Sequence, residues 1–75
     1  MPKLTILSGD ETIRRLEKLG FYQVRQRGSH VILKRQVNDS IIGCVVPLHK
    51  NLATGTLRGI LKQANVTIEE FINIK

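Results

Sequence analysis

The residues with the clearest potential for chemistry surround His30, which stands among basic residues in the middle of the chain. Arg25 and Arg27 precede it, and Lys34 follows it. Imidazole ordinarily accepts and donates protons near neutral pH, and cationic side chains stabilise charge on phosphate oxygens. This set suits cleavage of a phosphodiester by a neighbouring ribose hydroxyl, with His30 transferring a proton. An ordinary surface or half-buried strand histidine explains the same residues, so chemistry alone leaves both interpretations open.

A second histidine, His49, lies in a Pro-Leu-His-Lys segment after a β-favouring stretch. It could be a structural hydrogen-bonding residue, an RNA contact or a proton-transfer partner, and the first two together are favoured over catalysis. Thr54, Thr56 and Arg58 open a predicted helix, whose free backbone amides attract anions such as phosphate. The predicted RNA contacts in this part of the chain are His49, Lys50, Thr56 and Arg58.

The potential metal ligands do not form a recognisable site. Two histidines, one cysteine and six dispersed acidic residues lack the spacing of a zinc site, and no paired carboxylates indicate magnesium. Cys44 lies in a β-favouring run beside Val45, and we expect it to be buried rather than to act as a nucleophile. We therefore expect neither a metal nor a small-molecule cofactor.

The net charge indicates the kind of partner. The chain carries +6 at pH 7, and residues 21–66 hold seven lysines and arginines against one acidic residue, Asp39. Such a concentration favours a polyanion such as RNA, although a merely solvated basic surface has the same composition. With one tyrosine, two phenylalanines and no tryptophan, the chain is poorly supplied for stacking bases on aromatic rings.

Capping patterns predict the helices. Residues 8–11 have the Ser-x-x-Glu spacing of a capping box, which predicts a helix running to about Leu19. Thr54 is expected to cap a second helix with an apolar stripe that reaches Ala64. Residues 67–70 repeat the capping-box pattern and predict a short terminal helix.

Between these helices lie three β-favouring runs, residues 21–26, 29–36 and 41–46, separated by turn residues and ended by Pro47. They predict a three-stranded antiparallel meander in an α+β domain of order α-β-β-β-α, with a short C-terminal helix. Helices before and after a meander pack most simply on one face of the sheet and leave the other face open. Double-stranded RNA-binding domains (dsRBDs) share this topology, although a fold alone implies no function.

Strand alternation places His30 on the open face. It begins the central run, so Ile32 and Lys34 share its face, whereas Leu33 and Arg35 take the opposite face. An open, basic face is suited to binding RNA. Arg35 is also counted among the expected phosphate contacts.

The chain length limits the architecture. Its 75 residues allow one hydrophobic core, so we expect a single domain over residues 1–75. The composition, 41% hydrophobic and 24% charged, is that of a globular domain, and no apolar run is long enough to span a bilayer. The N-terminus lacks the apolar core of a signal peptide, and the single cysteine cannot pair within the chain. We therefore expect a soluble, cytoplasmic protein with no membrane partner.

Several motifs resemble those of one family. Residues 25–30 read Arg-Gln-Arg-Gly-Ser-His, residues 46–49 read Val-Pro-Leu-His, and residues 55–64 read Gly-Thr-Leu-Arg-Gly-Ile-Leu-Lys-Gln-Ala. With Leu-Glu-Lys-Leu-Gly-Phe at residues 16–21, these are similar to the G-S-H, V-P-x-H and G-T-L-x-x-I-L-K-Q-A patterns of the HicA mRNA interferase toxins, also described as YcfA-like. Asn65 stands where that family usually has glycine, but asparagine also tolerates left-handed geometry.

The resemblance implies a dsRBD-like fold, metal-independent cleavage of mRNA that arrests translation and growth, and a HicB-type antitoxin that covers the active site. His30 matches the position of the family's catalytic histidine. Ser29 belongs to the same motif and is counted as an RNA contact with Arg25, Arg27 and Lys34. We therefore expect an endoribonuclease toxin of a toxin–antitoxin pair.

Two alternatives remain open. A non-catalytic RNA-binding module explains the fold and the charge but gives no reason for His30. A purely protein-binding partner, whose basic surface meets an acidic antitoxin, explains the charge without RNA. A cleavage assay distinguishes the non-catalytic RNA-binding module from an endoribonuclease. Loss of RNA binding at moderate salt would favour the purely protein-binding partner.

Overall fold

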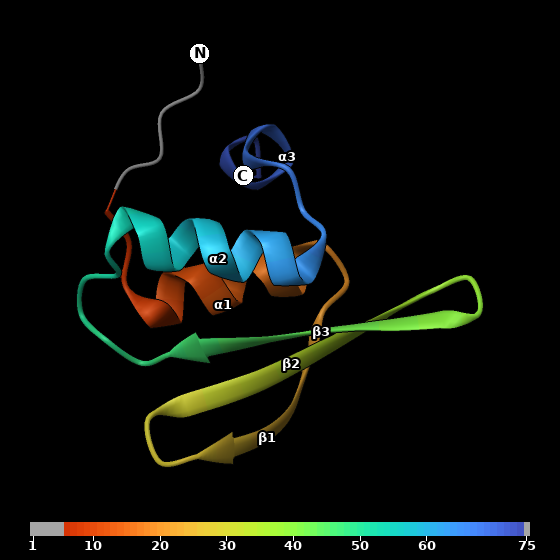
Figure 1. Cartoon of the computed structure of the whole chain (residues 1–75), viewed down its shortest axis with the longest axis horizontal. Helices are drawn as coiled ribbons and strands as arrows, with labels where there is room; N and C mark the ends of the chain where they lie inside the picture. The colour runs from red at the N-terminus through yellow and green to blue at the C-terminus, as the bar shows by residue number, and fades with distance from the viewer. Residues whose placement is uncertain (1–5, 75) are drawn as a thin grey trace.

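The described residues form three helices and three strands in the order that the sequence predicts. The computed structural model describes residues 6–74, in the order α1 (Gly9–Lys18), β1 (Tyr22–Arg27), β2 (His30–Val37), β3 (Ser40–Pro47), α2 (Thr54–Ala64) and α3 (Ile68–Ile72) (Figure 1). The strands form one antiparallel sheet in the order β1-β2-β3. The predicted α+β fold is thus confirmed. Within the described residues, no helix is both long and apolar enough to cross a membrane.

Side-chain caps begin α1 and α3, as the capping patterns predict. The hydroxyl of Ser8 accepts a hydrogen bond from the backbone N–H of Glu11 at 3.1 Å. At α3 the box is complete, because Thr67 accepts from the N–H of Glu70 and the Glu70 carboxylate accepts from the N–H of Thr67. The backbone and side-chain hydrogen bonds from Thr67 hold the pKa of Glu70 below its ordinary value.

The predicted start of α2 is wrong in one respect. Thr54 is the first helical residue, and Ala53 occupies the cap position with no side-chain hydrogen bond. The end of α2 is as expected, because Asn65 adopts the left-handed conformation with φ of 56° and its N–H donates to the carbonyl of Lys62. The first amides of α2 therefore have no side-chain acceptor from the cap.

The helices cover one face of the sheet. Figure 1 shows α1 and α2 lying on the same side of the three strands, and both contact β3. Every second side chain of β2 and β3 points into the resulting core, which is closed by Leu52 and Phe71 from the flanking segments. The central buried side chains, all under 2% exposed, are Thr12, Leu16, Leu33, Val46, Leu52, Leu57, Leu61 and Phe71. The opposite face of the sheet is left open.

Candidate nucleic-acid interface

The open face gathers the basic residues predicted from the sequence. Residues paired directly across antiparallel strands point their side chains to the same face, and the register pairs Arg27 with His30 and Arg25 with Ile32. Two residues beyond Ile32 along β2, Lys34 lies on this face as well. The intervening residues of β2 are buried in the core or half-buried on the helix side. The structure therefore brings His30, Arg25, Arg27 and Lys34 together on one exposed surface.

Apolar side chains accompany the cations on this face. The register places Tyr22 opposite Lys34, and it places Val45 of β3 opposite Ile32. Tyr22, Ile41 and Val45 are 50%, 62% and 38% exposed. The three strands contain no aspartate or glutamate. A surface of cations and exposed apolar groups without carboxylates suits a polyanion that also offers sugars and bases.

Arg35 is not brought to the open face. It points to the helix side of the sheet, where its guanidinium lies over the ring of Phe21 at 5.7 Å from the centroid. Arg35 is half-buried there and sits near Gly20 at the end of α1. Arg35 therefore lies on the opposite face of the sheet from Arg25, Arg27 and Lys34, with which the sequence analysis grouped it as an expected phosphate contact.

The segment after β3 ties His49 to the turn that precedes His30. Ser29 lies in the two-residue turn between β1 and β2, and its carbonyl accepts a hydrogen bond from the N–H of Leu48 at 2.6 Å. The carbonyl of His49 accepts from the N–H of Gly9, the first residue of α1, at 2.9 Å. Both histidine side chains are exposed, as are those of Ser29 and Lys50. The two histidine-bearing segments are therefore held at the same end of the sheet.

Gly9 is a positioning residue that the sequence analysis missed. A β-carbon added to it would overlap the carbonyl oxygen of Pro47 and lie 2.9 Å from the α-carbon of Leu48. Only glycine lets the start of α1 approach the end of β3 this closely. The sequence did contain a signal for this contact. A helix does not need glycine at its first position, so a glycine there indicates that another segment lies close to the backbone.

The start of α2 lies at the same end of the molecule. Figure 1 shows α2 beginning on the side of the molecule where β3 ends and where the β1–β2 turn lies. Thr56 and Arg58 are exposed in its first turns, on the layer of helices rather than on the open face of the sheet. An RNA bound at His30 reaches these two residues only if the RNA strand continues around the end of the sheet to the helix layer.

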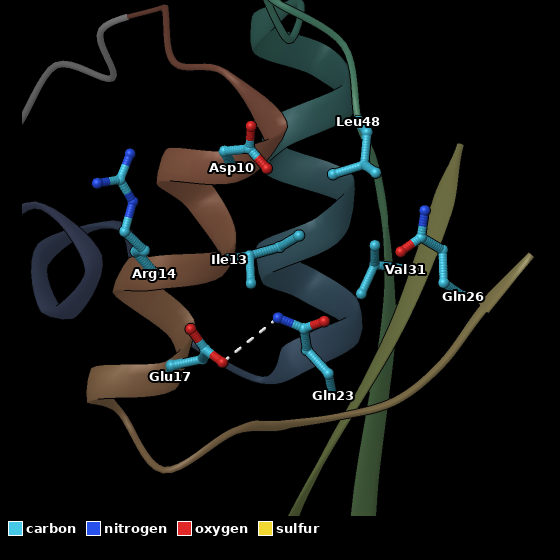
Figure 2. A pocket seen from close by; sticks show the side chains of 8 residues that line it. All are labelled: Asp10, Ile13, Arg14, Glu17, Gln23, Gln26, Val31 and Leu48. Carbon is cyan, nitrogen blue, oxygen red and sulfur yellow. Dashed lines mark hydrogen bonds between the residues drawn. The ribbon is translucent and has the colours of Figure 1, made fainter. Parts of the chain in front are cut away.

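A groove with different chemistry lies on the helix side, between α1 and β1 (Figure 2). Its volume is about 290 Å³. It is lined by Asp10, Ile13, Arg14, Glu17, Gln23, Gln26, Val31 and Leu48. The side chains of Gln23 and Glu17 point toward one another and form a hydrogen bond of 3.4 Å. The groove contains neither histidine, so it is separate from the candidate chemistry.

In the part of the chain that the structure describes, the other potentially reactive side chains do not form a second site. Cys44 is buried in the core, as predicted, and burial raises the pKa of its thiol to about 11. Among residues 6–74, no group of three or more histidine, cysteine, aspartate or glutamate side chains is arranged to hold a metal ion.

Comparison with models of known protein families gives a match over most of the chain. The sequence model described as HicA toxin of bacterial toxin–antitoxin matches residues 9–66. The chain belongs to the HicA toxin family. The matched region of this family member runs from the start of α1 to just beyond α2, so it includes the whole sheet and both histidines. No curated protein matches the chain. Membership implies a cognate antitoxin.

Proposed function

We propose that this HicA-family chain is a metal-independent endoribonuclease that cleaves mRNA, thereby arresting translation and growth. The observation that carries the proposal is the antiparallel register, which sets Arg27 directly beside His30 on an exposed face free of carboxylates. A proton-transfer group next to a guanidinium suits cleavage of an RNA phosphodiester, because one moves a proton and the other stabilises charge on the phosphate.

His30 transfers one of the two protons in the reaction. The 2′-hydroxyl of the RNA attacks the adjacent phosphorus while the 5′-oxygen leaves, so His30 either accepts the proton of the nucleophile or donates one to the leaving oxygen. Arg27, and with it Arg25 and Lys34, binds the phosphate and stabilises the charge that grows on its oxygens. Within residues 6–74, the imidazole of His30 forms no hydrogen bond or ion pair with another residue.

The antitoxin proposed for this chain is a HicB-type protein that binds the open face around His30. An acidic partner surface would neutralise the basic strands and block RNA at the same time. We place both proteins in the cytoplasm, where the mRNA substrate is. If a complex left His30 accessible, inhibition would require another mechanism.

Expression in a bacterial host tests this function. The wild-type chain should stop growth, and mapping of RNA 5′ ends should show new cleavage sites in mRNA. His30→Ala should abolish both effects. Gln36→Ala is the matched control, because Gln36 is exposed on the same strand and the same face. RNA binding by the wild type without new ends would favour a non-catalytic RNA-binding module instead.

A further inference from the structure

The segment that carries the second histidine, His49, lies at the end of the sheet where His30 begins β2. The β-ladder pairs His30 with Pro47, and the bond from the N–H of Leu48 to the carbonyl of Ser29 extends that ladder by one residue. His49 is therefore two residues beyond the partner of His30 and just past the end of β3. For comparison, diagonal neighbours within a ladder lie roughly 7–8 Å apart, within reach of long or aromatic side chains.

Burial along this segment follows the strand alternation. Pro47 is paired with His30 on the open face, whereas Leu48 is half-buried, packs against the core and lines the groove on the helix side. His49 is exposed. His49 lies beyond β3, which ends at Pro47, and continuing the alternation through Leu48 directs His49 toward the side of the sheet that carries His30.

From this juxtaposition we infer that His49 is a second catalytic residue, which performs the proton transfer that His30 does not. The inference rests on the proposed function. Attack by the 2′-oxygen forms a new P–O bond and breaks the bond from phosphorus to the 5′-oxygen. One imidazole accepts the proton of the 2′-hydroxyl, and the other donates a proton to the 5′-oxygen. The products are a 2′,3′-cyclic phosphate and a 5′-hydroxyl, and solvent restores the two histidines.

The need for two groups follows from geometry. The nucleophile and the leaving oxygen lie on opposite sides of the phosphorus during an in-line displacement, so one side chain cannot serve both. His30 begins β2 and His49 follows the end of β3, and Arg27, paired with His30, supplies the cation for the phosphate. Aspartate and glutamate are absent from all three strands.

Backbone hydrogen bonds hold the pair in place. The carbonyl of His49 is fixed by the N–H of Gly9, and the carbonyl of Ser29, next to His30, is fixed by the N–H of Leu48. Neither bond uses an imidazole, so both rings stay available for substrate. These bonds fix the backbone that carries the two side chains, which favours a constant arrangement for proton transfer.

The experiment measures single-turnover cleavage of one RNA by the wild type, His30→Gln and His49→Gln across a range of pH. His49→Gln should lower the rate by about 10²- to 10⁴-fold, and its pH–rate profile should lose one of the two limbs of the wild-type bell. The backbone carbonyl of residue 49 is unchanged, so His49→Gln should unfold at the wild-type urea concentration. Asn51→Gln, a neighbouring exposed substitution, should keep both limbs and the full rate.

A second substrate assigns the roles. In an RNA whose scissile 5′-oxygen is replaced by sulfur, the thiolate leaves without receiving a proton. One of the two histidine variants should recover a large part of its lost rate on this substrate, and the other should not. If His49→Gln cleaves ordinary RNA at the wild-type rate, or is slower with both limbs intact, the inference is overturned while the proposed function stands. If the wild type cleaves neither RNA, the proposed function fails and the inference fails with it.

Discussion

Replacing Gly9 by alanine should destabilise the fold sharply, because α1 meets β3 through this residue. The added β-carbon overlaps the carbonyl oxygen of Pro47 and lies 2.9 Å from the α-carbon of Leu48, and both are backbone atoms that cannot rotate away. Overpacking of this kind costs about 1–3 kcal/mol. Displacing α1 also weakens the bond from Gly9 to the carbonyl of His49, worth about 1 kcal/mol.

The better helix propensity of alanine offsets about 1 kcal/mol of this loss, so the net cost is about 1–3 kcal/mol. For a domain of this size each kcal/mol lowers Tm by about 4–8 °C, so the variant should melt roughly 5–25 °C below the wild type. Circular dichroism at 222 nm follows the transition.

Gly59→Ala is the matched control for this substitution. Gly59 lies inside α2, is exposed, and an added β-carbon there would meet no atom within 4 Å. Alanine at this position should stabilise the fold by about 0.5–1 kcal/mol. A Gly9→Ala variant as stable as the wild type would refute the close approach between α1 and β3.

Three other outcomes are expected. The association constant for single-stranded RNA should fall with salt, and its logarithm plotted against the logarithm of salt concentration should have a slope of roughly −3 for four or five phosphate contacts. Lys34→Ala should make this slope shallower by about 0.7, whereas Lys62→Ala on α2 should leave it unchanged. A flat salt response in a filter-binding titration would contradict the basic interface. RNA cleavage should persist in EDTA, and inhibition that added magnesium reverses would contradict the proton-transfer mechanism. Because burial raises the pKa of Cys44 from 9.0 to about 11, its thiol favours folding below pH 9, and this contribution should be lost as the pH rises through 11. Urea titrations should therefore show the stability gap between wild type and Cys44→Ala narrowing above pH 9 by on the order of 2 kcal/mol; a constant gap would contradict it.

Local patterns were enough to predict on which face of the sheet several candidate site residues lie. The alternation along β2 correctly put His30 and Lys34 on one face and Arg35 on the other, because that strand has no irregularity and its apolar residues set the buried side. The same pattern did not justify grouping Arg35 with the phosphate contacts, since its guanidinium lies over Phe21.

Long-range geometry could not be predicted. The register of β1 shifts between Gln23 and Arg25, and this bulge turns Tyr22 to the open face opposite Lys34. No local residue pattern marks a bulge at Val24. The contact of Gly9 with the end of β3 likewise joins segments far apart in the sequence, and it depends on how α1 packs against β3.

The most direct test of the central claim is the cleavage rate of one end-labelled RNA in EDTA, measured for the purified wild type and for His30→Ala. His30 is exposed at the start of β2, so its replacement should change stability by under about 0.5 kcal/mol and leave most RNA affinity intact at low salt. The account predicts cleavage by the wild type and a rate at least about 10²- to 10⁴-fold lower for the variant. Equal rates for the two proteins would contradict it.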